Sequence, residues 1–172
     1  MQWCNNGACM PVSSYLLEGE ISYETVAPVL RWLDTPTHKH LGIDSTGGNP
    51  SAAFFLARAL NENCESVSVC VTGYCYSAAM YMLIDLYQSV TVSVCPGVLG
   101  MLHYASVEMM QFPNGKTRDL DDKRAQEQML LDYKKWVDEW ARRNLSRSER
   151  SKLRSGHDVY FNYDRMKELF ER

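Results

Sequence analysis

The chain has 172 residues, of which 45% are apolar, and its formal net charge at pH 7 is −3. This length and apolar content suffice for one compact domain with its own core, and the slightly acidic balance gives no electrostatic case for nucleic-acid binding. No apolar run is long enough to span a bilayer, and the first residues lack the basic and apolar regions of a secretory signal, so we expect a cytoplasmic protein with no membrane partner. We assign residues 1–13 to an N-terminal tail and residues 14–172 to a single domain.

Strand and helix patterns alternate along the first hundred residues. Strands are predicted over residues 14–17, 41–45, 67–72, 89–94 and 99–104, with helices between them over residues 22–33, 51–61 and 77–87. Because residues 67–71 form a nearly continuous apolar strand, we expect a mainly parallel α/β sheet in which such strands are covered on both faces.

The chain becomes helical for more than twenty residues after Leu120. One face of this helix carries an apolar stripe, formed by Met129, Tyr133, Trp136, Val137 and Trp140. The pair Ser146 and Glu149 has the spacing of a capping box and predicts a short helix, and Asn162 or Tyr163 begins a last one.

Ser77 stands where the apolar strand at 67–72 gives way to an apolar helix. The first turn of a helix offers unpaired N–H groups and the positive end of the dipole, so a serine there can act as a nucleophile whose oxyanion product is stabilised. The same position also suits a serine that only caps the helix, and for a single serine the cap is the more common role.

Two further segments favour the nucleophile. Gly47 and Gly48 follow the strand at 41–45, and paired glycines allow backbone N–H groups to approach a ligand closely. His103 ends an apolar stretch within the strand at 99–104 and is a candidate general base. Cys75 is a rival nucleophile two positions before Ser77, but its apolar surroundings favour a packing role.

In order and spacing, these segments resemble the proteolytic subunits of Clp proteases. The matching segments are residues 17–21 (Leu-Glu-Gly-Glu-Ile), 44–48 (Asp-Ser-Thr-Gly-Gly), 73–80 (Gly-Tyr-Cys-Tyr-Ser-Ala-Ala-Met), 101–103 (Met-Leu-His), 114–119 (Asn-Gly-Lys-Thr-Arg-Asp) and 156–161 (Gly-His-Asp-Val-Tyr-Phe). The resemblance covers nearly the whole chain, from residue 16 to residue 169. It departs from the family pattern at Thr46, Ala78 and His157, where the family carries proline, methionine and often arginine.

The resemblance implies a serine endopeptidase that cleaves peptides or unfolded proteins without a cofactor or metal. By this likeness Ser77 is the nucleophile, His103 the base and Asp158 the residue that orients the base, and the backbone N–H groups of Gly48 and Ala78 form the oxyanion hole. His157 is a rival for Asp158, but adjacent residues of an extended segment point to opposite faces, so one of the two faces the site.

The resemblance also implies the Clp/crotonase fold, a superhelix of ββα turns with a mainly parallel sheet and a protruding C-terminal handle helix. We expect a homo-oligomer, with Trp136 and Trp140 of the handle helix at the subunit interface or packed on the core beside it. The residues before Gly19 show no counterpart of the family's axial loop, so docking of an ATP-dependent unfoldase stays open.

Three alternatives remain at this point: a catalytically silent Clp-fold ring or scaffold subunit, a phage head-maturation protease, and a crotonase-like acyl-CoA enzyme. The spacing of Cys4 and Cys9 matches no standard zinc pattern, and whether the two pair is open. His38 and His40 are expected in a polar surface loop with no metal-binding partner nearby.

Overall fold

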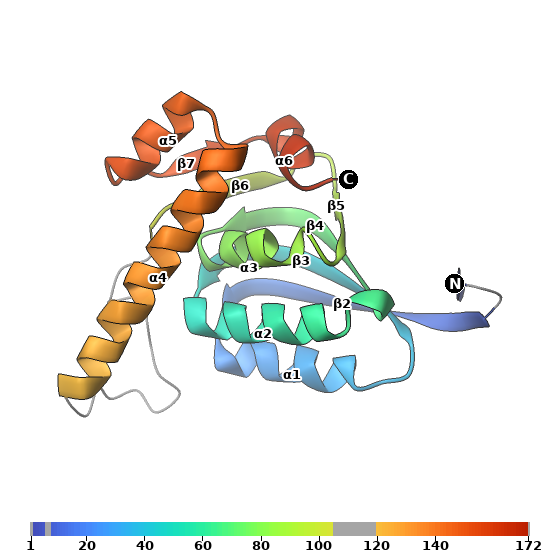
Figure 1. The fold of residues 1–172 in the computed structure, drawn as a ribbon. Helices are drawn as coiled ribbons and strands as arrows, with labels where there is room; N and C mark the ends of the chain where they lie inside the picture. The colour runs from blue at the N-terminus through green and yellow to red at the C-terminus, as the bar shows by residue number, and fades with distance from the viewer. Residues whose placement is uncertain (1, 6–7, 105–119, 172) are drawn as a thin grey trace.

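The computed structural model describes residues 2–5, 8–104 and 120–171, and its centre is a mixed β-sheet (Figure 1). The pairs that link β2, β3, β4, β5 and β6 are parallel, whereas β1–β2 and β6–β7 are antiparallel. The predicted α/β class with a mostly parallel sheet is therefore confirmed. The strands are β1 (Gln2–Asn5), β2 (Ala8–Ile21), β3 (His38–Gly48), β4 (Val67–Tyr76), β5 (Thr91–Val94), β6 (Leu99–Leu102) and β7 (Val159–Phe161).

The helices begin where the sequence supplies caps. Asn49 caps α2 with Pro50 in the first turn, Ser146 and Glu149 form the predicted capping box of α5, and Asn162 caps α6. The helices are α1 (Tyr23–Leu33), α2 (Pro50–Glu62), α3 (Ala78–Leu86), α4 (Leu120–Asn144), α5 (Arg147–Arg154) and α6 (Tyr163–Phe170), with a 3₁₀ turn η1 at Cys64–Ser66.

One layer of helices covers the sheet. α1, α2 and α3 lie side by side on the same face (Figure 1), and α3, in which Asp85 is the one charged residue, is buried at nearly every position. Leu16, Tyr74 and Leu99 are exposed large apolar side chains of the strands. The expected cover on both faces therefore holds for residues 67–71 of β4, which are buried apart from half-buried Ser68, but it does not extend over the sheet, because Thr72 and the three apolar side chains just named are exposed.

The long helix α4 extends away from the sheet at its N-terminal half and packs on the domain at its C-terminal half (Figure 1). Trp140 is 5% exposed and stacks on Phe170, with ring centroids 5.8 Å apart. Trp136 meets Phe54 edge to face at 5.4 Å. Of the two placements expected for these tryptophans, the structure shows the one against the core of the same chain.

Several boundaries differ from the sequence-based expectation. β2 begins at Ala8, so residues 8–13, which we assigned to the tail, pair with β1 and β3. His38 and His40 belong to β3 and not to a loop, and His38 is buried. Residues 114–119, which carried one of the matching segments, lie outside the described residues.

Candidate active site

Ser77 occupies a strained turn between β4 and α3. Its φ of 52° and ψ of −115° make it the one non-glycine residue with positive φ in the described part of the chain. The turn is held at both ends, because Ser77 N donates to Met101 O at 2.8 Å and Tyr81 N donates to Ser77 O at 3.1 Å. Strain of this kind persists only where the surrounding structure enforces it, and it is concentrated at functional sites.

The side chain of Ser77 does not cap the helix that it precedes. Its hydroxyl makes no hydrogen bond to the first turn of α3, and Ser77 Oγ instead lies 2.5 Å from His103 Nε2. The simple capping role is therefore excluded for this serine. A hydroxyl in hydrogen-bond contact with an imidazole nitrogen is the arrangement by which a histidine activates a serine.

The pairing of β6 with β4 places His103 beside Ser77. Tyr76 pairs with Met101 in the parallel register, so the residue that follows β6 arrives next to the residue that follows β4. The hydroxyl of Tyr81, one turn into α3, donates to the backbone carbonyl of His103 and fixes the segment after β6. Two parallel strands and one helix thus hold the serine and the histidine together.

Asp158 lies behind the imidazole. The antiparallel pairing of Leu102 with Val159 brings it next to His103, and Asp158 Oδ1 is 3.5 Å from His103 Nδ1. This separation is within ion-pair range and longer than an ordinary hydrogen bond. The Asp158 side chain is 44% exposed, and its Oδ2 accepts a hydrogen bond of 3.3 Å from the hydroxyl of Tyr160.

His157 faces away from this cluster. Its Nδ1 contacts Ser155 Oγ at 3.2 Å, and its side chain is exposed. The structure therefore brings Ser77, His103 and Asp158 together and leaves His157 outside, as the alternation of neighbouring side chains on an extended segment requires.

The glycine turn after β3 packs directly against the serine. Gly47 and Gly48 have φ of 94° and 138°, and a Cβ on Gly47 would lie 2.7 Å from Ser77 Cβ and 3.1 Å from Ala78 N. A side chain at Gly47 would clash, so the turn reaches the start of α3 only because it has none. The turn that contains Gly48 thus lies beside the Ala78 amide, the second donor expected of an oxyanion hole.

Cys75 is fully buried two positions before Ser77. Burial raises the pKa of its thiol far above the ordinary range, so the thiol stays protonated and is a poor nucleophile. The predicted packing role of Cys75 is confirmed.

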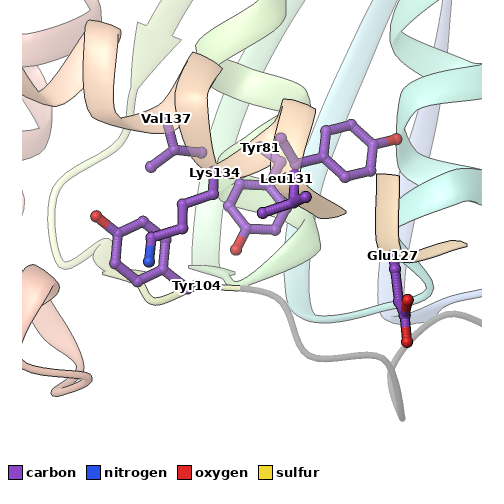
Figure 2. Close-up of a pocket in the computed structure, with 7 residues that line it drawn as sticks. Tyr81, Tyr104, Glu127, Leu131, Lys134 and Val137 are labelled. Atoms are coloured by element: carbon purple, nitrogen blue, oxygen red, sulfur yellow. The ribbon is translucent and has the colours of Figure 1, made fainter. Parts of the chain in front are cut away.

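A cavity of about 380 Å³ opens beside the residue that follows His103. Figure 2 shows its lining, with Tyr81 from α3, Tyr104 after β6, and Leu131, Lys134 and Val137 from α4. Tyr104 Oη donates to Asp138 Oδ1 at 2.6 Å, and burial together with this bond raises the pKa of the phenol. Reasoning from sequence identified the apolar stripe of α4 but not this pocket, because the pairing of α4 with α3 has no sequence signal.

The histidines of β3 form a separate polar cluster. Ser68 Oγ lies 3.0 Å from His40 Nδ1 and 3.4 Å from His38 Nε2. Burial lowers the pKa of His38, and the nearby charges of His40 and Lys39 lower it further. Across the described residues, no group of three or more side chains could jointly hold a metal ion.

No protein-family model matches the chain, and no curated protein matches it. Within the described residues, no helix has the length and apolar character needed to cross a membrane.

Proposed function

We propose that this protein is a serine endopeptidase of the Clp proteolytic-subunit type that acts through an acyl-enzyme intermediate. The observation that carries the proposal is the 2.5 Å contact between Ser77 Oγ and His103 Nε2 in a turn with positive φ, with Asp158 on the far side of the imidazole. The long helix α4 and the parallel strands that end at the site agree with the Clp/crotonase fold that the proposal includes.

In the proposed mechanism, His103 Nε2 accepts the proton of Ser77 as the serine oxygen attacks the carbonyl carbon of the peptide. The negative charge that develops on the carbonyl oxygen is stabilised by the N–H groups of Gly48 and Ala78. His103 then gives its proton to the leaving amine, and a water molecule, activated in the same way, hydrolyses the acyl-enzyme. Asp158 keeps the Nδ1 proton of His103 directed away from the serine and stabilises the imidazolium.

The substrate is a peptide or an unfolded protein, as the resemblance implies. The cavity that Tyr104, the residue after His103, helps to line supports it, because Tyr81, Leu131 and Val137 give that cavity an apolar wall. Assembly into a homo-oligomer and a cytoplasmic location belong to the same proposal.

A catalytically silent Clp-fold subunit is the second candidate. The observation that favours it is the 3.5 Å separation between His103 and Asp158, together with the solvent exposure of the carboxylate. A silent subunit keeps the fold and the contacts of Ser77 but does not react with carbonyl or phosphonyl electrophiles.

Labelling with a fluorophosphonate followed by peptide mapping tests the proposal. We expect one modified serine, Ser77, and hydrolysis of short peptide esters that falls by about 10⁴-fold or more in Ser77→Ala, as in other triads. Ser89→Ala removes an exposed hydroxyl near the other end of α3 and serves as the matched control. A folded wild type without labelling supports the silent subunit, and full activity in Ser77→Ala contradicts the assignment.

A further inference from the structure

Cys70 and Cys95 form a pair of thiols on neighbouring strands, apart from the candidate active site. Cys70 lies in the middle of β4 and is buried, while Cys95 follows β5 directly and is partly exposed. Their sulfur atoms are 3.1 Å apart. Because a disulfide bond is about 2.05 Å long, an approach of about 1 Å is enough to join them.

The backbone holds the two residues in this position. Cys70 pairs with Ser93 in the parallel register of β4 and β5, and the chain stays beside β4 past the end of β5, because Cys95 N donates to Val71 O at 2.9 Å. Val94, the residue before Cys95, is also held in place, because its N donates to Glu171 Oε1 at 2.8 Å. The contact between the thiols therefore follows from strand pairing and does not depend on a mobile loop.

Cys64 and Cys75, the other cysteines whose side chains the structure describes, lack such a partner. Among Cys64, Cys70, Cys75 and Cys95, the side chains that the structure describes, only Cys70 and Cys95 have their sulfur atoms in contact. Cys75 is fully buried on the same strand as Cys70 and provides a natural internal comparison.

We propose that Cys70 and Cys95 form a redox-active dithiol site, which hydrogen peroxide oxidises to an intramolecular disulfide. The thiolate of Cys95, the partly exposed member of the pair, attacks one oxygen of the peroxide. An S–O bond forms, the O–O bond breaks, and the hydroxide that leaves takes up a proton to become water. The sulfur of Cys70 then attacks the sulfenic acid, the S–S bond forms, and the S–O bond breaks with release of a second water. The two thiols lose two electrons and two protons, and a thiol reductant reverses the reaction.

The surroundings of Cys95 make this oxidation slow at neutral pH. The hydrogen bond with Cys70 raises the pKa of Cys95, and burial and the nearby Glu171 carboxylate raise it further. Since the thiolate is the reacting form, the rate rises with pH. The site is thus one that responds to sustained oxidation and not a fast peroxide sensor.

The disulfide closes a loop from residue 70 to residue 95, which contains Ser77 and the whole of α3. Closing a loop of this length restricts the unfolded chain, so the oxidised protein melts at a higher temperature, by about 5–15 °C. The proposal does not depend on the peptidase function, because neither thiol takes part in it.

The test uses the reduced full-length chain, treated with hydrogen peroxide at about pH 8.5, where ordinary thiols are half ionised. Free thiols are then alkylated, and the intact mass and the non-reduced peptide map are measured. We expect a loss of two hydrogen atoms, two fewer alkyl groups, and a linked pair of peptides that contain Cys70 and Cys95. Dithiothreitol restores both alkylation sites and the lower melting temperature.

Cys70→Ser and Cys95→Ser each abolish the linked peptide, whereas the matched variant Cys75→Ala keeps it. The inference is overturned if the wild type gains oxygen atoms on these cysteines without a cross-link. It is also overturned if both cysteines stay alkylatable throughout, or if the linked peptides hold other cysteines of the six in the chain.

Discussion

At the scale of single residues, some features of the candidate site could be predicted from the sequence and others could not. The order of the glycine pair, Ser77 and His103 along the chain predicted which residues meet, because the carboxyl ends of parallel strands converge on one edge of a sheet. The positive φ of Ser77 and the lack of a capping bond emerged only from the structure. No residue pattern reports the backbone conformation of a serine.

The acid of the site provides the first prediction. Asp158→Asn removes the negative charge that stabilises the imidazolium, so we expect kcat to fall by about 10³–10⁴-fold, by analogy with the acids of other triads. His157→Ala, the matched control, changes kcat little, because its side chain contacts Ser155 and faces away from the site. Peptide ester hydrolysis measures both, and the reverse ranking of the two variants contradicts the assignment of Asp158.

Tyr160 contacts the proposed acid of the site, and sequence reasoning missed it. Its hydroxyl donates to Asp158 Oδ2 at 3.3 Å, but the side chain is 65% exposed, so the bond contributes little. We expect Tyr160→Phe to lower kcat by about 2–5-fold with KM unchanged. A fall in substrate affinity alone, with kcat intact, indicates that Tyr160 contacts the substrate and does not position the acid. Tyr74→Phe, another exposed tyrosine of the sheet, is the control.

At the scale of elements, the sequence predicted the long helices and missed the short strand that matters most. The capping box of Ser146 and Glu149 and the strand that precedes Ser77 have strong local patterns, and both are confirmed. β7 has only three residues, and nothing local distinguishes it from a loop. Its pairing with β6 is what carries Asp158 to His103. His38 and His40 were misplaced because β3 extends by pairing with β2 beyond its apolar segment.

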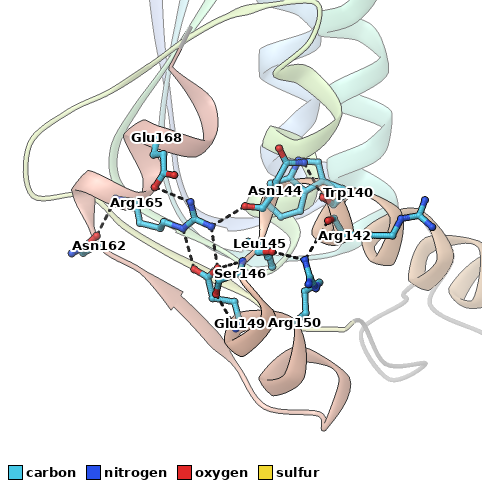
Figure 3. A network of polar contacts seen from close by, with 10 residues as sticks. All are labelled: Trp140, Arg142, Asn144, Leu145, Ser146, Glu149, Arg150, Asn162, Arg165 and Glu168. Carbon is cyan, nitrogen blue, oxygen red and sulfur yellow. Dashed lines mark hydrogen bonds and ion pairs between the residues drawn. The ribbon is translucent and has the colours of Figure 1, made fainter.

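The segment that bears Asp158 is anchored by a polar network between α4, α5 and α6 (Figure 3). Glu149 accepts a hydrogen bond of 2.6 Å from Ser146 N and two hydrogen bonds of 3.0 Å from nitrogen atoms of Arg165. Arg165 also donates to Asn144 O at 2.8 Å. Both side chains of this ion pair are only about a fifth exposed, at 21% and 22%. Glu149 and Arg165 therefore fix both ends of the segment that runs from α5 through β7 to α6.

This network gives a prediction on pH and stability. Burial raises the pKa of Glu149, but the bonds from Arg165 and Ser146 outweigh burial, so the pKa lies below its usual value. A depressed pKa means that the stabilisation is fully present above the pKa of the unfolded chain, at about 4.3, and is lost as the pH falls through the lower folded value. We expect Glu149→Gln to lower the free energy of unfolding by about 1–3 kcal/mol at pH 7.

Urea unfolding of the two proteins from pH 7 down to pH 3 measures this difference. The difference in the free energy of unfolding between wild type and Glu149→Gln becomes smaller as the pH falls, because protonation of the Glu149 carboxylate removes the same charge from the wild type. Glu139→Gln is the control, because Glu139 pairs with Arg143 on the exposed face of α4. This variant should change the free energy of unfolding little at any pH. A gap of constant size across this range shows that Glu149 does not act through its charge.

At the scale of the whole molecule, the contacts within one chain bear on which surface is left for self-association. The sequence left two placements for Trp136 and Trp140, a subunit interface or the core beside it, and Phe54 and Phe170 of the same chain contact them. The amphipathic stripe showed that the tryptophans are covered, and it does not reveal which chain covers them. The large apolar side chains that remain exposed include Tyr74 of β4 and Leu99 of β6, which are register partners on adjacent strands.

We therefore predict that self-association uses the exposed sheet surface around Tyr74 and Leu99. Monomers seldom leave neighbouring apolar side chains uncovered. Two adjacent charges at these positions remove the apolar surface that an interface would bury, and they repel the equivalent charges of a second subunit. Sedimentation velocity at micromolar concentration should show an oligomer for the wild type and a monomer for the folded double variant Tyr74→Glu, Leu99→Glu. Phe55→Glu, an equally exposed apolar position on α2, is the control and should leave the oligomer intact. A monomeric wild type refutes self-association, and an oligomer that survives the double substitution but not Phe55→Glu places the interface on the helical layer.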